Sequence, residues 1–163
     1  MLLDDEVFAV LTAIVVVASV FSAAMLIREG YVAEPFTAIG LLNENCRIGE
    51  YPGYVRSNST VTLCLYVYNH EGKPLYWKVV YRLGSNKTLP TNTTPSPEPA
   101  IQEWRGVLGH RQNSTFKVAV RIPEIPLNTT RVTLIFELWV YDVNLHTWVY
   151  TGRWVHLHVN VAR

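Results

Sequence analysis

The sequence predicts an all-β fold, an immunoglobulin-like antiparallel β-sandwich, preceded by one N-terminal transmembrane α-helix. Three observations predict it: a charge-free apolar run near the N-terminus, alternating apolar and polar positions over the rest of the chain, and turn residues between the alternating runs. The expected parts are a transmembrane anchor over residues 1–30 and an extracytoplasmic β-sandwich domain over residues 31–163.

The composition narrows the class of protein. Hydrophobic residues make up 49% of the 163 positions, which excludes a disordered chain. Charged residues make up 17%, below the roughly 25% usual for soluble domains, which indicates a membrane or a covered surface. The net charge is +1, so the chain lacks the basic footprint of a nucleic-acid partner.

The apolar run from Val7 to Ile27 contains 21 residues and no charge. A helix of this length spans about 31 Å, close to the roughly 30 Å core of a bilayer. The acidic residues before the run, 4–6, suit the start of a helix dipole. We expect an uncleaved single-pass anchor, in contact with the lipid bilayer from Val7 to Ile27.

Two other interpretations of the run remain open. A cleavable signal peptide has a basic leading region and a shorter apolar core, although Ser22-Ala23-Ala24 resembles a cleavage site. A buried helix of a soluble protein normally shows a polar face, and none interrupts this run.

Five Asn-x-Ser/Thr sequons place the domain outside the cytoplasm. They begin at Asn58, Asn86, Asn92, Asn113 and Asn128, none has Pro in the middle, and each falls at an expected turn or strand edge. The alternative is that Thr-rich strands create accidental matches. We expect glycosylation at these five residues and a cell-membrane location with the C-terminal domain extracytoplasmic.

Cys46 and Cys64 are the only cysteines. An even pair in an extracytoplasmic domain predicts a disulfide. A metal or redox pair is the alternative, but the sequence shows neither a CxxC motif nor a neighbouring His.

Period-two alternation continues through the domain. Apolar residues occupy every second position in five runs: 61–67, 75–83, 116–122, 132–140 and 155–161. Such alternation places one side of each strand in a core. About seven strands in roughly 130 residues are typical of an immunoglobulin-like sandwich.

Turn residues separate the runs. Asn69-His70-Glu71-Gly72 predicts a tight hairpin, with Gly72 available for a positive φ. Residues 142–145 and 151–152 predict two later reversals of the chain. Residues 84–100 are rich in Pro, Thr and Asn and carry two of the sequons, which predicts an exposed, extended loop.

The segments Gly49-Glu50-Tyr51-Pro52 and Asn69-His70-Glu71-Gly72-Lys73-Pro74, together with the closing stretch 136–159, resemble an uncharacterised family of archaeal membrane proteins. This is the domain of unknown function 1616 family, and the resemblance covers roughly residues 36–161. It implies a membrane-anchored, outward-facing β-domain in an archaeon and supplies no catalytic residues. Family members often carry several transmembrane helices, whereas this chain has one.

Candidate chemistry in the sequence is sparse. His156 and His158 lie two apart on one strand face, a spacing that offers two metal ligands, but no acidic residue or Cys joins them, so we expect a structural pair. A blue-copper site needs Cys and His, usually with a late axial Met, but both Cys fall early and the only Met residues are 1 and 25. His70 and Glu71 could act as acid and base, yet turn chemistry explains their surroundings. We therefore expect no metal, no cofactor, no catalytic residue and no enzymatic activity.

Aromatic residues occupy strand positions that should face outward. They are Tyr66, Tyr68, Trp139, Tyr141 and Trp154, with Trp148 in addition. Aromatic side chains anchor protein interfaces, so these residues are the expected partner-binding surface. The alternative is that a long loop or the glycans cover them.

These observations favour a non-catalytic, glycosylated, membrane-anchored accessory or structural subunit of an archaeal cell-envelope or membrane protein complex, with other membrane or envelope proteins as partners. The second hypothesis is a pilin-like subunit of a surface filament or envelope lattice that binds copies of itself. Pilins are processed at a short basic leader, and this sequence shows none. The third is a module that binds carbohydrate or another small ligand.

Overall fold

The computed structural model of the chain describes residues 4–30 and 34–162. The chain divides into two compact units, Met1–Glu34 and Pro35–Arg163. Of the predicted anchor and sandwich, residues 1–3, 31–33 and 163 lie outside the described residues.

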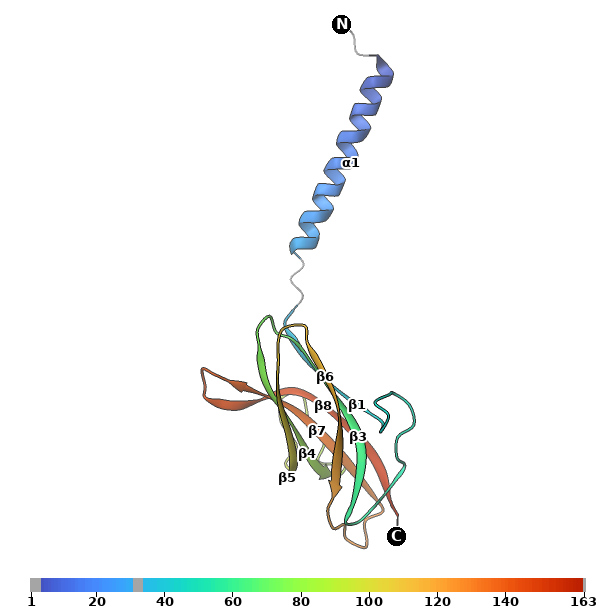
Figure 1. Ribbon diagram of the computed structural model, residues 1–163, viewed down its shortest axis with the longest axis vertical. Helices are drawn as coiled ribbons and strands as arrows, with labels where there is room; N and C mark the ends of the chain where they lie inside the picture. The colour runs from blue at the N-terminus through green and yellow to red at the C-terminus, as the bar shows by residue number, and fades with distance from the viewer. Residues whose placement is uncertain (1–3, 31–33, 163) are drawn as a thin grey trace. The chain divides into compact units, whose positions relative to one another are not determined.

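The first unit contains one α-helix, α1, at Asp5–Gly30 (Figure 1). Its segment Asp5–Met25 has a mean hydropathy of 2.5 and is long and apolar enough to cross a membrane. A signal sequence near an N-terminus meets the same two criteria. The acidic residues Asp5 and Glu6 occupy its first turn, where they complement the positive end of the helix dipole.

The second unit is a sandwich of two β-sheets, which confirms the predicted fold class (Figure 1). The three-stranded sheet has the order β1 (Phe36–Leu42), β3 (Ser59–His70), β6 (Asn113–Ile122). The five-stranded sheet has the order β2 (Tyr54–Arg56), β8 (Thr147–Ala162), β7 (Arg131–Asp142), β4 (Leu75–Gly84), β5 (Ala100–Leu108). Neighbouring strands are antiparallel except for β2, which runs parallel to β8. The described residues form eight strands, one more than the alternation predicts.

The five predicted apolar rows line the space between the two sheets. Their buried members include Leu63 and Leu65 of β3, Val79 of β4 and Leu134 and Leu138 of β7. Two aromatic pairs stack inside this core: Trp77 with Phe116 at 5.6 Å, and Tyr81 with Phe136 at 5.2 Å between ring centroids. Burial raises the pKa of the Tyr81 phenol.

The predicted disulfide between Cys46 and Cys64 is present, with the two Cα atoms 5.1 Å apart. Cys64 lies on β3 and is fully buried, whereas Cys46 belongs to the loop between β1 and β2. The bond therefore fastens that loop to the outer face of the three-stranded sheet.

The turn at residues 69–72 is not the predicted hairpin. β3 belongs to the three-stranded sheet and β4 to the five-stranded sheet, so this turn passes from one sheet to the other. Gly72 does take a positive φ of 75°, as expected. The same turn residues are compatible with a hairpin and with a crossing between sheets. The strands with which β3 and β4 pair decide between the two, and most of those strands are distant in sequence.

Of the two predicted reversals near the C-terminus, one is confirmed. Residues 143–146 form the turn between β7 and β8. Thr151 and Gly152 instead lie inside β8 as a β-bulge: Trp139 pairs with Tyr150, whereas the preceding Leu138 pairs with Arg153. Gly152 has a φ of 72°, which a bulge requires as readily as a turn does.

The loop 85–99 is exposed at most of its residues, as its composition predicts, but it forms turns and bends and is not extended. It folds over the outer face of the five-stranded sheet, where it covers side chains that point away from the core. Those side chains are almost fully buried: Val80, Thr133, Ile135 and Glu137. The sheet is therefore covered on both faces over this region.

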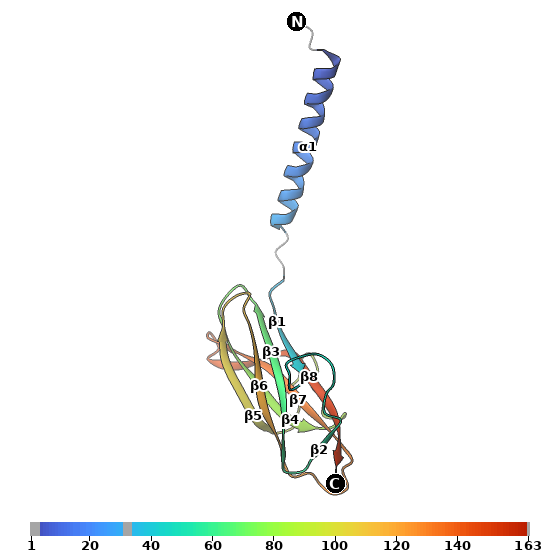
Figure 2. The same cartoon turned by 45° about the vertical axis from the view of Figure 1, so that its right-hand side comes forward.

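Gln102 joins the two sheets along one side of the sandwich. Its Nε2 donates to the carbonyl oxygen of Ala119 at 3.1 Å, and its Oε1 accepts from the Arg121 amide at 2.6 Å. The side chain of Gln102, on β5, thus forms two hydrogen bonds with the backbone of β6, the edge strand of the other sheet. On the other side, β1 lies alongside β8 (Figure 2).

Candidate interaction surfaces

The end of the sandwich where the chain enters β1, here called the entry end, carries the turns 71–74 and 109–112 (Figure 1). The turn 143–146, at the tip of the hairpin of β7 and β8, projects to the side. Asn69 holds the first two together and is fully buried. Its Nδ2 donates to the carbonyl oxygens of Lys73 and Leu108, both at 2.9 Å, and its Oδ1 accepts from the Glu71 amide. The turn chemistry that the sequence favours over an acid–base pair at His70 and Glu71 is therefore present, with Asn69 at its centre.

A buried carboxylate, Glu137 of β7, anchors the loop 85–99. Its Oε1 accepts from the Ser96 amide at 2.6 Å, and its Oε2 accepts from Arg82 Nε at 3.0 Å. Arg82 also donates to the carbonyl oxygen of Glu98 in the loop. A buried charge needs a partner and hydrogen bonds to offset its lost hydration, and Glu137 has both.

Two outward aromatics lie at the border of the loop. Trp139 donates from Nε1 to Glu137 Oε2 at 3.2 Å, and its ring lies 5.4 Å from that of Tyr150. The Tyr150 hydroxyl donates to the carbonyl oxygen of Thr91 at 2.8 Å. Burial, with the nearby Glu137 charge, raises the pKa of Tyr150 to about 12. The loop therefore covers part of the outward aromatic surface, which is one of the alternatives to a partner that the sequence analysis gives.

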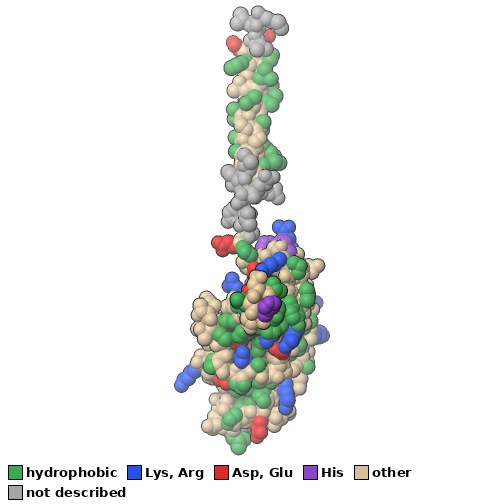
Figure 3. Space-filling model, turned by 90° about the vertical axis from the view of Figure 1, so that its left-hand side faces the viewer, with side chains coloured by type: hydrophobic (Ala, Val, Ile, Leu, Met, Phe, Trp, Pro, Cys, Tyr) green, Lys and Arg blue, Asp and Glu red, His purple; other side chains and the backbone are tan. Residues whose placement is uncertain are grey.

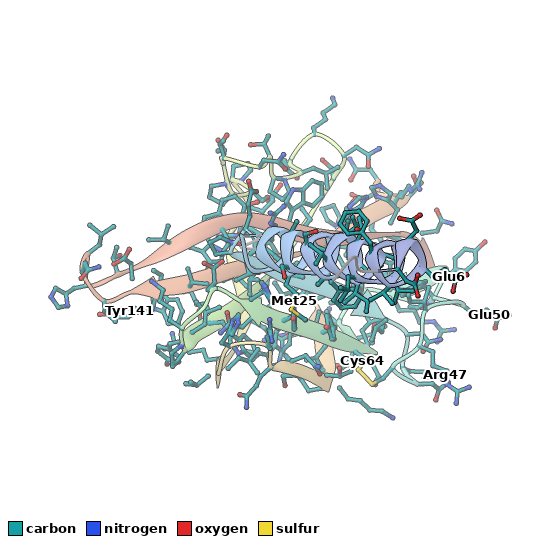
Figure 4. All side chains as sticks on the ribbon, turned by 90° about the horizontal axis from the view of Figure 1, so that it is seen from above. Glu6, Met25, Arg47, Glu50, Cys64 and Tyr141 are labelled. Carbon is teal, nitrogen blue, oxygen red and sulfur yellow. A yellow bond between two sulfur atoms is a disulfide. The ribbon has the colours of Figure 1, made fainter. Side chains whose placement is uncertain are left out.

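Beyond that border lies an aromatic and basic surface in which Tyr76 and Arg105 are exposed and the other members are half-buried. It consists of Tyr76, Lys78, Arg105, Tyr141 and Trp148, and we call it the arm surface because the hairpin of β7 and β8 carries two of its members. Figure 3 shows hydrophobic and basic side chains side by side on this aspect of the molecule, and Figure 4 places Tyr141 on the projecting hairpin, well away from Cys64. Only Tyr141 belongs to the five residues that the sequence predicts.

Trp148 is the centre of the arm surface. Its ring lies 4.9 Å from that of Tyr76 and 5.5 Å from that of Tyr141. Two cations lie over it: Lys78 Nζ at 4.9 Å and the Arg105 guanidinium at 5.5 Å from the ring centroid. Sequence reasoning missed Tyr76, Lys78 and Arg105, because only the strand register brings them beside Trp148.

Glu103 sets the charge of the arm surface. It pairs with Lys78 at 3.1 Å and with Arg105. Burial opposes ionisation of Glu103, but the hydrogen bonds from Arg105 and Lys78 outweigh it and lower the pKa of the carboxyl. Two cations against one carboxylate leave the surface with a net positive charge.

The other predicted partner residues lie elsewhere. Tyr66 and Tyr68 occupy the outer face of the three-stranded sheet, where Tyr66 lies opposite Gly40 of β1. Trp154 lies on the outer face of β8, with its ring 5.2 Å from His156. The structure therefore divides the five predicted residues among four places: the three-stranded sheet, the loop border, the arm surface and the outer face of β8.

His156 and His158 share the outer face of β8, as the alternation predicts, with their rings 4.6 Å apart. His158 Nδ1 forms a hydrogen bond of 2.8 Å with the Thr133 hydroxyl. Burial and then the neighbouring His158 lower the pKa of His156. Over residues 4–30 and 34–162, no group of three or more His, Cys, Asp or Glu is arranged to hold a metal ion.

All five sequon asparagines are exposed. Four lie in turns or bends, and Asn113 is the first residue of β6. Their predicted positions at turns and strand edges are confirmed, and each side chain is open to modification.

No family model matches the chain, and no curated protein matches it. The fold is similar to that of the CARDB domain of the PF1109 protein from Pyrococcus furiosus. Its crystal structure with di-metal ions has 14% sequence identity and a TM-score of 0.48, over 78% of this chain and 93% of that chain. Its solution NMR structure has 13% identity and the same TM-score, over 78% and 95%. The PapD-like domain of human CEP192 has 8% identity and a TM-score of 0.32, over 76% and 82%. At these identities the similarity concerns the fold alone.

Proposed function

We propose that the chain is a non-catalytic, glycosylated, membrane-anchored subunit of an archaeal cell-envelope or membrane protein complex. In this proposal α1 lies in the bilayer and the sandwich lies outside the cytoplasm. The length and hydropathy of α1 support the anchor. The five exposed sequons and the disulfide support an extracytoplasmic domain, because both modifications belong to that side of a membrane.

The observation that carries the proposal is the arm surface. The loop 85–99 covers only part of the outer face of the five-stranded sheet, and Tyr76, Tyr141 and Trp148 lie outside this cover, beside two cations. Clusters of Tyr, Trp and Arg are typical of the centres of protein interfaces. A partner that fits this surface offers an apolar pocket for the rings and a carboxylate for Lys78 or Arg105.

Site-directed photo-crosslinking in intact membranes tests the proposal. A photoreactive residue replaces Tyr141 on the arm surface, and a matched one replaces Tyr54, which is 68% exposed on β2. We expect one defined membrane or envelope polypeptide to be crosslinked from position 141 and not from position 54. This product should be lost when Trp148→Ser is added.

Each other outcome of this experiment has a meaning. Crosslinks to a second copy of the chain favour the filament or lattice subunit, and crosslinks only to saccharide favour the carbohydrate-binding module. The same products from both positions, or none from either, contradict docking through the arm surface. Glycopeptide mass spectrometry of the five sequons tests the glycosylated, extracytoplasmic placement separately.

A further inference from the structure

Asn113 lies directly opposite Tyr68 across the ladder between β3 and β6. Two residues further along, Thr115 lies opposite Tyr66. Directly opposed residues of an antiparallel pair project from the same face, with Cβ atoms about 5 Å apart. The Asn and the Thr of one sequon therefore share the outer face of the three-stranded sheet with two tyrosines.

Tyr68 belongs to a platform of four rings at the entry end, formed by Phe36, Tyr68, His70 and His110. The ring centroids of Phe36 and His70 are 5.1 Å apart, and those of His70 and His110 are 4.8 Å apart. The Tyr68 hydroxyl lies 3.3 Å from His70 Nδ1. The Gly72 amide donates to His110 Nδ1 at 3.0 Å, which joins the platform to the turn after β3.

Asn113 differs from the other four sequon asparagines in its surroundings. Asn58, Asn86, Asn92 and Asn128 lie in turns or bends and are exposed. Asn113 lies in a strand, where the direction of its side chain is fixed by the pleat and an aromatic ring is its cross-strand neighbour. A sugar on Asn113 thus begins beside the platform.

We infer that the first sugars of a glycan on Asn113 lie against the Tyr68 ring and cover the platform. This inference rests on the glycosylated, extracytoplasmic placement proposed above. In the modification, Asn113 Nδ2 forms a bond to the anomeric carbon of a lipid-linked sugar phosphate donor. The bond from that carbon to the phosphate oxygen breaks, the phosphate leaves with its electron pair, and Nδ2 loses one proton.

The physical basis is the charge distribution of the ring. The face of an aromatic ring is negative, and the C–H groups on one face of a sugar ring are weakly positive and apolar, so the two surfaces attract and exclude water. The Tyr68 platform then binds a sugar of its own chain. Tyr66 and Tyr68 are reassigned from the predicted partner surface, which leaves the arm surface to bind protein.

A double-mutant cycle tests the inference. The full chain is produced in a host that performs N-glycosylation, and glycopeptide mass spectrometry determines the occupancy of Asn113. The unfolding equilibrium is then measured for the original chain, Asn113→Gln, Tyr68→Thr and the double variant, with Asn128→Gln as the matched control. Tyr68→Leu, which keeps an apolar side chain without a ring, replaces Tyr68→Thr if the latter does not fold.

Loss of the glycan through Asn113→Gln should raise the unfolding equilibrium constant about fivefold when Tyr68 is present and much less when it is absent. Asn128→Gln should have the same effect in both backgrounds. In NMR spectra, C–H protons of the first sugar should show an upfield ring-current shift that Tyr68→Leu removes.

Equal effects of Asn113→Gln in both backgrounds, with no ring-current shift, overturn the inference and leave the glycosylated placement intact. An unmodified Asn113 beside other modified sequons also overturns the inference alone. If all five sequons are unmodified, the glycosylated placement fails and the inference fails with it.

Discussion

The backbone of Gly152 lies directly against the carbonyl oxygen of Asn92, so that a Cβ atom added to Gly152 would be 2.1 Å from that oxygen. The contact joins the bulge of β8 to the loop 85–99. Glycine meets two demands here, a φ of 72° and the absence of a side chain.

Gly152→Ala should therefore destabilise the domain by more than backbone strain alone. Strain at a positive φ costs about 1–2 kcal/mol. Gly72→Ala isolates that effect, because Gly72 has a φ of 75° and nothing within 4 Å of an added Cβ. We expect the loss in unfolding free energy for Gly152→Ala to exceed that for Gly72→Ala by about 1 kcal/mol. Denaturant unfolding measures both, and equal losses would show that the loop yields without cost.

Glu137→Gln should release the loop 85–99. The variant keeps the shape of the side chain but removes the charge that pairs with Arg82, which should lower the unfolding free energy by about 3 kcal/mol. The loop should also become sensitive to trypsin at the exposed Lys87. The matched control is Glu103→Gln, which breaks the more exposed ion pair of Glu103 with Lys78. This variant should lower the unfolding free energy by about 0.5 kcal/mol. Unchanged cleavage at Lys87 would contradict the anchoring role.

Asn69→Ala should destabilise the entry end by about 3 kcal/mol, because the buried carbonyl groups of two turns lose their donor. Asn144→Ala, in the exposed turn between β7 and β8, serves as the control and should change stability little. Chemical denaturation gives both values, and similar small losses would mean that water replaces the Asn69 side chain.

At alkaline pH, Tyr150 should resist ionisation. Its pKa is about 12 in the folded chain against 10.0 for an unperturbed Tyr. Because the folded pKa is raised, the stability that this phenol contributes is complete below pH 10 and is lost as the pH rises through about 12. Ultraviolet titration of tyrosinate should show one fewer late-ionising group in Tyr150→Phe. Loss of a group that ionises near pH 10 instead would contradict the burial of Tyr150.

Replacement of both Cys46 and Cys64 by Ala should lower the unfolding free energy by about 3 kcal/mol, the chain-entropy estimate for a loop of this length. The control is the original chain treated with reductant, which should lose the same amount. A loss in the double variant alone would indicate a packing defect at the buried Cys64.

Local alternation carried most of the fold prediction. The inward rows of β3, β4, β6, β7 and β8 follow directly from period-two spacing, because a strand that faces one core must alternate. The disulfide between the two cysteines and the exposure of the sequons were also predicted correctly, because each depends on residue type and local position.

The features that escaped prediction depend on distant pairing. Glu137 and Ser96 are 41 positions apart, and nothing in the composition of the loop indicates that its Ser96 amide binds a buried carboxylate. One signal was present: Ile135 and Val80 occupy outward positions, and apolar residues there indicate a covered face. The arm surface likewise needed the register that sets Lys78 and Arg105 beside Trp148.

The bond of Gln102 to β6 has a consequence for how copies of the chain can meet. An exposed strand edge is a template on which another chain can add a strand, and natural proteins block such edges to remain soluble. On β6 the backbone groups of Ala119 and Arg121 that could pair with a strand of another copy already form hydrogen bonds with the side-chain amide of Gln102. Sheet growth from one copy into the next is therefore disfavoured along this side.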